Sequence, residues 1–285
     1  MKHRDIRSST CGWVMLVAAV MAACLWPAAG CSGDAGAGTA QATRAGSSGT
    51  VVPAADVSYR FAVCGDNRLR GIENGVLERI VESARNRGAG FIVDNGDLTN
   101  NGTVAELELY RSFTESSGIR FYSVIGNHDL GPVLAGEAYR EVIGPLYYSF
   151  DYAGDHFIVV DNADLFKGID TEQLQWLIRD LQDSAGMGRQ FVFAHVPMNS
   201  PADDDGFAAE RTTSSEERFL QAATAQANLA AFFFGHLHGY AAYDIDGTAA
   251  YVSGGGGAPL NPAKAVGFYH YLLVTVSPEG VQVEV

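Results

Sequence analysis

Cysteine is scarce in this chain. Three of the four cysteines, Cys11, Cys24 and Cys31, lie near the N-terminus, and Cys64 stands alone in the remainder. A single cysteine cannot form an internal disulfide, so the folded part must be stabilised by its core. Hydrophobic residues make up 47% of the 285 residues, which is enough for a sizeable core in one large domain or two small ones.

Clusters of lysine and arginine are also missing beyond the N-terminus. Asp and Glu number 33 against 19 Lys and Arg, which gives a formal net charge of −14. Proteins that bind nucleic acid need a basic patch to displace counterions, so we expect no nucleic-acid-binding surface. An acidic protein that acts on an anionic substrate needs cations in its site, and this favours bound metal ions over an arginine clamp.

The long apolar run of the chain is short for a membrane span. It covers sixteen residues, Cys11 to Trp26, and follows a basic segment at residues 2–7. A spanning helix needs about 20 residues, whereas a basic segment before a shorter apolar run is typical of an export signal. We therefore predict a signal peptide over residues 1–30 and an exported protein of the periplasm or cell envelope.

Small residues precede Cys31 in the stretch Ala28-Ala29-Gly30-Cys31, which resembles the cleavage site of a bacterial lipoprotein. Cys24 is a rival lipidation site, and ordinary cleavage near Gly30 is the alternative. We expect contact with the membrane only through this lipid anchor. Residues 31–55 are rich in Gly, Ala, Ser and Thr and predict a flexible linker, followed by a domain over 56–285.

The domain alternates apolar runs of strand and helix type. Helix periodicity marks 74–87, 104–116, 171–182 and 214–225. Strands are expected at 57–64, 91–94, 119–125, 147–152, 156–161, 191–194, 229–234, 249–252, 268–276 and 281–285. Early strands alternate with helices and later ones form hairpins, so we predict an α/β fold with mixed sheets.

Polar side chains follow five of these strands, at the point where each strand ends. The residues are Asp66, Asp97, Asn127, His128, Asp129, His195, His236 and His238. Functional sites of α/β sheets gather outside the carboxyl ends of strands, so we expect these side chains to meet. Carboxylate, amide and imidazole groups form the ligand set of divalent transition metals, and the pattern therefore predicts a metal site.

The set of motifs resembles the metallophosphoesterase family, the calcineurin-like phosphoesterases. The family pattern runs Asp-x-His, Gly-Asp, Gly-Asn-His-Asp/Glu, His and Gly-His-x-His. This chain has Gly65-Asp66-Asn67-Arg68, Gly96-Asp97, Gly126-Asn127-His128-Asp129, His195 and Gly235-His236-Leu237-His238. The resemblance covers residues 57–285. It implies a four-layer αββα sandwich, in which two mixed β-sheets pack face to face between helices.

The same resemblance implies a metal-dependent hydrolase of phosphate mono- or diesters, in which a hydroxide bridging two metal ions attacks phosphorus. The ions would be two divalent transition metals, Mn, Fe or Zn. By position, Asp97 would bridge them. The other donors would be Asn127, His195 and His236 for one ion, and Asp66 and His238 for the other. The expected substrate is a phosphate-ester small molecule or an envelope component.

Two further residues receive catalytic roles from the resemblance. His128 would face the substrate, where it would stabilise charge on the phosphate or protonate the leaving oxygen. Asp129 would orient the imidazole of His128 and raise its pKa, because a neighbouring anion favours the protonated ring.

Position 68 departs from the family pattern, because Arg68 stands where the metal-binding histidine belongs. A guanidinium has no lone pair for a metal. Water or Asn67 could fill the gap, the two ions could bind unequally, or Arg68 could face solvent. We expect Arg68 to point inward and hold the substrate phosphate in its planar fork, beside a weakened first metal site. The alternative function is a noncatalytic binding or scaffold protein with a degenerate metal site.

A run of four glycines at 254–257 lacks the lysine and helix of a phosphate-binding loop, so we expect a close-packed loop near the metals. His156 and His270 lie in strand-like runs, and we expect structural roles for both.

Overall fold

The computed structural model describes residues 44–45, 57–132, 135–200, 212–261 and 265–285, all within one compact unit of residues 41–285. The expected signal peptide, both candidate lipidation cysteines and all of the expected linker except Arg44–Ala45 lie outside the described residues. Among the helices that are described, none has the length and apolar character needed to cross a membrane.

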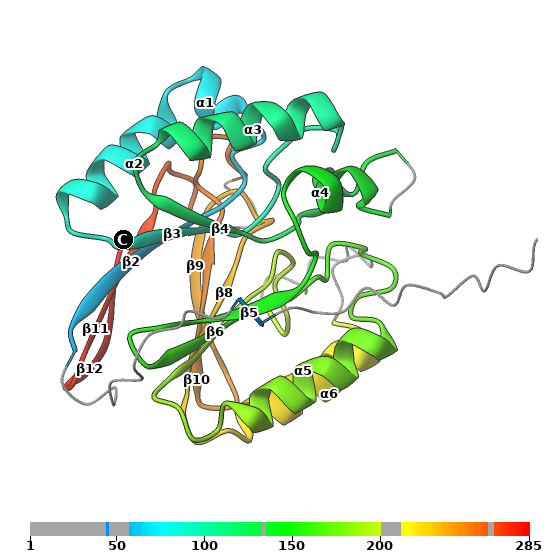
Figure 1. Cartoon of the computed structure of the whole chain (residues 1–285), viewed down its shortest axis with the longest axis vertical. Helices are drawn as coiled ribbons and strands as arrows, with labels where there is room; N and C mark the ends of the chain where they lie inside the picture. The colour runs from blue at the N-terminus through cyan, green and yellow to red at the C-terminus, as the bar shows by residue number, and fades with distance from the viewer. Residues whose placement is uncertain (1–43, 46–56, 133–134, 201–211, 262–264) are drawn as a thin grey trace, which may run out of the picture. The chain divides into compact units, whose positions relative to one another are not determined.

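Two mixed sheets form the centre of this unit (Figure 1). In the larger sheet, β6, β7, β8 and β10 run parallel, while β9 and β5 pair antiparallel at the two sides. Its order is β1 (Arg44–Ala45), β5 (Tyr148–Tyr152), β6 (Asp155–Val159), β7 (Gln190–Phe193), β8 (Leu229–Phe234), β10 (Thr248–Ser253) and β9 (Tyr240–Ile245). The two residues of β1 lie within the stretch expected to be linker and pair with β5.

The smaller sheet has a parallel half and an antiparallel half. Its order is β12 (Gly280–Glu284), β11 (Leu272–Ser277), β2 (Tyr59–Cys64), β3 (Phe91–Asp94) and β4 (Arg120–Ser123). Because β2, β3 and β4 are parallel, the loops that follow them leave the sheet at one edge.

Aromatic side chains fill the space between the sheets. Phe61 of β2 is fully buried, and its ring stacks on Phe91 at 5.2 Å between centroids. Phe157 and Phe191 of the opposite sheet meet the Phe61 ring edge-on, each at 5.4 Å. Successive residues of a strand point to opposite faces, so the alternate residues of β2, Ala62 among them, pack outward against α2.

Helices cover the outer face of each sheet (Figure 1). On the smaller sheet lie α2 (Val76–Asn86) and α3 (Val104–Ser116), and on the larger sheet lie α5 (Thr171–Asp183) and α6 (Ser214–Thr224). Three of these helices have side-chain caps at their first turn, from Thr103, Asp170 and Thr213. The expected four-layer αββα sandwich is thus confirmed.

The structure adds elements that the sequence pattern did not predict. Two short helices, α1 (Arg70–Glu73) and α4 (Glu137–Val142), are too brief to show a helical period. Strand β9 was also not expected, and its alternation is blurred by two alanines. The strand expected at 268–276 begins only at Leu272, because the N–H of His270 donates instead to the carbonyl of Gly255 at 3.2 Å.

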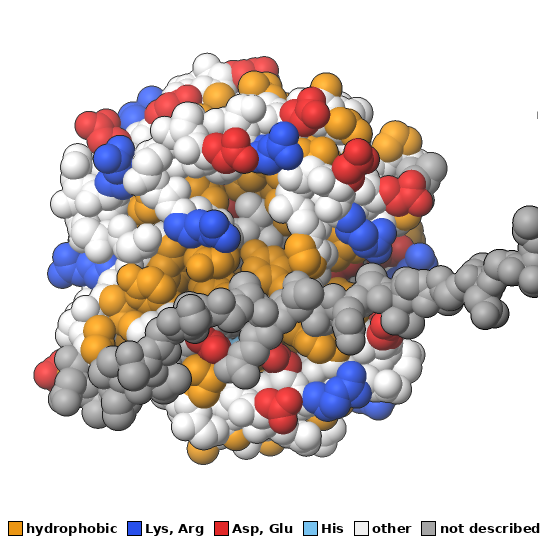
Figure 2. All heavy atoms as spheres, in the orientation of Figure 1, with side chains coloured by type: hydrophobic (Ala, Val, Ile, Leu, Met, Phe, Trp, Pro, Cys, Tyr) orange, Lys and Arg blue, Asp and Glu red, His pale blue; other side chains and the backbone are white. Residues whose placement is uncertain are grey.

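On the face shown in Figure 2, lysine and arginine side chains are scattered among acidic ones and do not gather into a patch.

Truncation of Phe61 tests the aromatic core between the sheets. The Phe61→Ala variant should lose about 3–5 kcal/mol of unfolding free energy, because the surrounding rings cannot close over the cavity. Urea denaturation measures this loss. Phe166, which is 83% exposed, offers a matched control, and Phe166→Ala should leave the urea midpoint nearly unchanged. An equal loss in both variants would contradict the assignment of the core.

Candidate metal centre

Two loops of the smaller sheet bring the first carboxylates together. Asp66 lies just beyond β2 and Asp97 just beyond β3, and the strands are parallel neighbours. The N–H of Asp66 donates to the carbonyl of Gly96 at 2.9 Å, and the N–H of Arg68 donates to the carbonyl of Asp97 at 2.8 Å. The backbone of the two loops therefore fixes the two carboxylates side by side.

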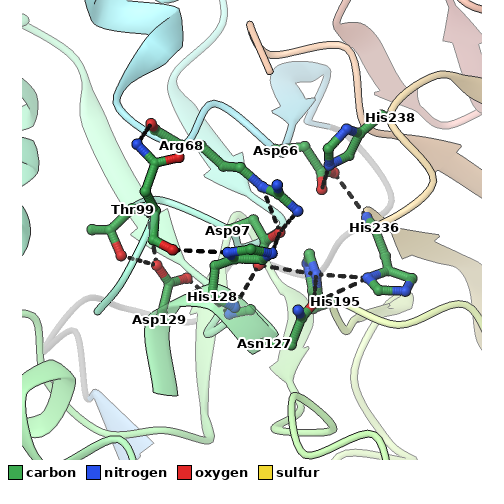
Figure 3. Close-up of polar contacts among 12 residues, drawn as sticks. Asp66, Arg68, Asp97, Thr99, Asn127, His128, Asp129, His195, His236 and His238 are labelled. Atoms are coloured by element: carbon green, nitrogen blue, oxygen red, sulfur yellow. Dashed lines mark hydrogen bonds and ion pairs between the residues drawn. The ribbon is translucent and has the colours of Figure 1, made fainter. Parts of the chain in front are cut away.

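The larger sheet supplies the histidines. His195 follows β7, while His236 and His238 follow β8, its parallel neighbour. The N–H of His236 donates to Oδ2 of Asp66 at 2.8 Å, so a hydrogen bond joins the loops of the two sheets. Figure 3 shows the resulting cluster, into which side chains from five separate loops point.

The backbone at this cluster is strained. Among the described residues, nine non-glycine residues have positive φ, including Asp66 at 60°, Asp97 at 55°, His236 at 69° and His238 at 49°. Such conformations are rare for non-glycine residues and persist where the surrounding structure enforces them, often at functional sites. Here the strain aims four donor side chains at one region.

Glycine allows the loops to approach this closely. A Cβ on Gly126 would overlap the backbone nitrogen and Oδ1 of Asp97. In the glycine run, a Cβ on Gly254 would lie 2.8 Å from Oδ2 of Asp66, and the N–H of Gly256 donates to the carbonyl of Gly65 at 2.8 Å. The expectation of a close-packed loop beside the site is confirmed.

Three donor atoms form a tight triangle on one side of Asp97. Oδ1 of Asn127 lies 3.0 Å from Nε2 of His195 and 3.0 Å from Nδ1 of His236, and the two nitrogens are 3.3 Å apart. Oδ1 of Asp97 lies 3.3 Å from Nε2 of His195. We call Asp97, Asn127, His195 and His236 the four-donor set.

The protonation state of His195 indicates that the four-donor set needs a bound cation. Its Nδ1 lies 2.8 Å from the carbonyl of Asn95, which can only accept, so Nδ1 carries the proton and Nε2 the lone pair. Burial lowers the pKa of His195 to about 4, so the ring is neutral at pH 7. Nε2 and Oδ1 of Asn127 are then two acceptors facing each other at 3.0 Å. A cation between them resolves this repulsion, and the donors fit a divalent metal.

A second set of donors lies on the other side. One donor atom from each of Asp66, Asp97 and His238 falls within 4.8 Å of the others. Nδ1 of His238 donates to the carbonyl of Pro259 at 2.7 Å, which leaves the lone pair on Nε2, 3.4 Å from Oδ1 of Asp66. That oxygen is buried and accepts no hydrogen bond from any residue that the structure describes. We call this group the three-donor set, and it also fits a cation.

The two carboxylates differ in their electrostatic surroundings. Burial and the neighbouring charge of Asp97 raise the pKa of Asp66 well above its ordinary value, and a cation beside Asp66 would favour its ionised form. Burial alone would also raise the pKa of Asp97, but His195, Arg68 and His128 together lower it to about 2. Asp97 is therefore a fixed negative charge at the centre of the site.

His128 lies outside both donor sets. Its Nδ1 donates to the carbonyl of Asn100 at 2.8 Å, and its Nε2 is 4.0 Å from Oδ2 of Asp97. The imidazole is 33% exposed and therefore open to a substrate. Its catalytic role stays a prediction.

The role expected for Asp129 is wrong. Its carboxylate is buried and accepts hydrogen bonds from the N–H groups of Leu98, Thr99 and Gly126 and from the hydroxyl of Thr99. With both oxygens occupied in this way, Asp129 holds two loops together and does not orient His128. The carbonyl of Asn100 does so instead.

Arg68 points inward, as expected, and not to solvent. Its Nε and Nη2 donate to Oδ2 of Asp97 at 3.0 and 2.9 Å (Figure 3), and the side chain is only 21% exposed. Asn67 does not replace the missing ligand. Its amide donates to Asp94 at 2.9 Å, and its oxygen accepts from the N–H of Leu69 at 2.9 Å.

The groups that sequence reasoning missed are backbone carbonyls. Those of Asn95, Asn100 and Pro259 orient His195, His128 and His238 respectively. No residue type marks a carbonyl that will accept from a ring nitrogen, so the sequence held no sign of them. His156 has the structural role expected, because its two ring nitrogens contact Asp151 at 2.6 Å and Asp180 at 2.8 Å.

Two facing mixed sheets with nitrogen and oxygen donor sets at their strand ends form a site suited to binding metal ions. The model of the calcineurin-like phosphoesterase family matches residues 59–240, and the chain belongs to this family. It is a hydrolase that acts on phosphoester bonds. No curated protein sequence matches the chain.

Solved structures share the fold at low sequence identity. A dimetal phosphatase from Danio rerio has a TM-score of 0.59 at 16% identity, and the alignment covers 79% of this chain and 98% of that one. GAP50, the anchor in the inner membrane complex of Plasmodium, has a TM-score of 0.59 at 16% identity and coverages of 80% and 84%. A purple acid phosphatase from yellow lupin seeds has a TM-score of 0.59 at 17% identity and coverages of 79% and 50%.

Asp97→Asn tests the shared carboxylate. The amide keeps the shape of the side chain but removes the charge, so metal affinity should fall by at least the ~10–100-fold that loss of a partner behind a ligand costs. Metal content after gel filtration measures the loss, and circular dichroism checks the fold. Retention of metal and turnover would refute the central role of Asp97.

Proposed function

We propose that this protein is an exported metal-dependent phosphoesterase that hydrolyses phosphate mono- or diesters. The observation that carries the proposal is the arrangement of two donor sets around Asp97, with the ring of His128 and the guanidinium of Arg68 beside them but outside the ligands. In such a site, ions held by the donor sets would bind a phosphate ester on one side, and His128 and Arg68 would contact it on the other.

The donor sets would hold divalent ions of the Mn, Fe or Zn class. When bound, such an ion lowers the pKa of a coordinated water towards 7 and neutralises phosphate oxygens. Asn127, His195 and His236 contribute neutral donors, and the two carboxylates supply the negative charge. A low count of negative ligands leaves net positive charge for an anionic substrate.

His128 is placed to act on the leaving group. The hydrogen bond to Asn100 fixes the proton on Nδ1, so Nε2, 4.0 Å from Oδ2 of Asp97, is the ring nitrogen left to act on a substrate. A proton on Nε2 would stabilise charge on the phosphate or pass to the leaving oxygen. Arg68 has N–H groups beyond the two that Asp97 accepts, and these can donate to phosphate oxygens.

The proposed location rests on the N-terminal sequence. The basic segment, the apolar run and the small residues before Cys31 support export and lipidation at Cys31 or Cys24. The substrate would then be an extracytoplasmic phosphate ester, either a small molecule or an envelope component.

A noncatalytic scaffold with a degenerate site is the competing function, and Arg68 is the residue that raises it. Of the positions that the family pattern assigns to metal, only position 68 lacks a donor. The orphaned buried oxygen of Asp66 argues that the remaining donors are built for cations.

Turnover of chromogenic esters tests the proposed function directly. Protein loaded with Mn²⁺ should hydrolyse p-nitrophenyl phosphate, bis(p-nitrophenyl) phosphate or both, because the ion supplies the nucleophile and the charge. Chelation should abolish turnover, and added Mn²⁺ should restore it. A protein that binds metal yet cleaves neither ester would support the scaffold instead.

His128→Ala separates catalysis from metal binding. The variant should lose at least tenfold in kcat, as expected for removal of a positioned acid that contributes about 10²–10⁴-fold, while its metal content stays near wild type. Arg70, an exposed residue of α1, serves as a control, and Arg70→Ala should leave kcat unchanged. Loss of metal from His128→Ala would move this histidine into the ligand shell.

A further inference from the structure

Hydrogen bonds fix the backbone of Arg68, as they fix the backbone of the metal-donor residues. Its N–H donates to the carbonyl of Asp97 at 2.8 Å, and its carbonyl accepts from the side chain of Asn100 at 3.0 Å. Its φ of 48° is one of the strained values of the site. These hydrogen bonds to Asp97 and Asn100 fix the backbone of Arg68 and therefore the direction in which its side chain leaves the loop.

The two oxygens of Asp97 serve different partners. Oδ1 faces Nε2 of His195 at 3.3 Å and accepts the N–H of His128 at 2.9 Å. Oδ2 accepts both contacts from the guanidinium of Arg68, at 2.9 and 3.0 Å. One oxygen thus belongs to the four-donor set, and the other already has a permanent cation.

The two donor sets also differ in the number of their donors and in the charge beside them. In the four-donor set, the atoms of Asn127, His195 and His236 form a triangle with edges of 3.0, 3.0 and 3.3 Å, a compact face for one ion. The three-donor set has fewer donors, and Oδ1 of Asp66 lies 3.4 Å from Nε2 of His238. It also shares Asp97 with the guanidinium, so an ion there would meet a positive charge close by.

We infer that the centre holds one divalent ion tightly, in the four-donor set, and that the guanidinium of Arg68 supplies the positive charge that a tightly held ion would supply beside Asp66 and His238. The phosphate would then lie between a metal ion and a guanidinium fork. This inference rests on the proposed function for the nature of the substrate, and on the contacts of Arg68 for everything else.

The consequence of the inference is that a single substitution restores a second tight site. In Arg68→His, the guanidinium is gone and an imidazole donor stands at the position where the family pattern has one. Histidine also tolerates positive φ better than most residues, so the backbone of the loop should persist. Arg68→Ala removes the charge but adds no donor, which separates the two effects.

The experiment measures bound Mn²⁺ per chain and its electron paramagnetic resonance spectrum. Wild type should hold one Mn²⁺ tightly, with the spectrum of an isolated ion. Arg68→His should hold two, with the spectrum of a spin-coupled pair. Arg68→Ala should bind its second ion at least about tenfold more tightly than wild type does, because the repulsion is gone. Arg70→His, a histidine two residues away on an exposed position, should behave as wild type.

Three results would overturn the inference. They are two tightly held ions in wild type, a single ion in Arg68→His, and no gain of affinity in Arg68→Ala. Turnover of p-nitrophenyl phosphate and of bis(p-nitrophenyl) phosphate by the same preparations keeps the two proposals apart. An active wild type with two tight ions would refute only the role of Arg68. An inert wild type with one ion would refute the proposed function and leave the metal count standing.

Discussion

The carboxylate of Asp97 is the group on which the centre depends. It is fully buried, and it joins the loops of both sheets by accepting a backbone N–H from the Asn127–Leu130 turn, contacting a histidine of the larger sheet and pairing with Arg68. A buried charge of this kind is tolerated only when cations and donors surround it. The strained backbone at positions 66, 68 and 97 follows from this demand, because relaxed loops would not bring these groups to one carboxylate.

Much of the fold was predictable because its patterns are local. Apolar runs predicted β2, β3, β7 and β8 at their correct places, and helix periodicity predicted α3, α5 and α6. The metal donors were predictable for a related reason. Each follows directly on a buried strand, and parallel strands end at one edge. Short elements such as α4 carry too few residues to show any period.

The finer roles depend on contacts that no residue pattern records. Asp129 seemed suited to orient His128 because the two are neighbours in sequence, yet the 3₁₀ turn Asn127–Leu130 points its carboxylate back at the N–H groups of Leu98, Thr99 and Gly126. The direction of Arg68 depends likewise on its left-handed backbone, which a sequence does not reveal. Spacing identifies the donors of such a site, but the turn geometry decides what each side chain touches.

The hydrogen bond from the N–H of His236 to Asp66 has a wider consequence. Together with the bonds from Asn95 to the carbonyl of Phe234 and from Ser253 to the carbonyl of Val63, it ties one sheet to the other at the rim of the aromatic layer. An ion bound by donors from both sheets would add a further link between the sheets at this rim. Ligands that bind only the native state raise its stability by mass action, by about 2.7 kcal/mol at a free concentration of 100 times Kd. The resistance of this protein to heat and to proteases would therefore rise and fall with the supply of metal around it.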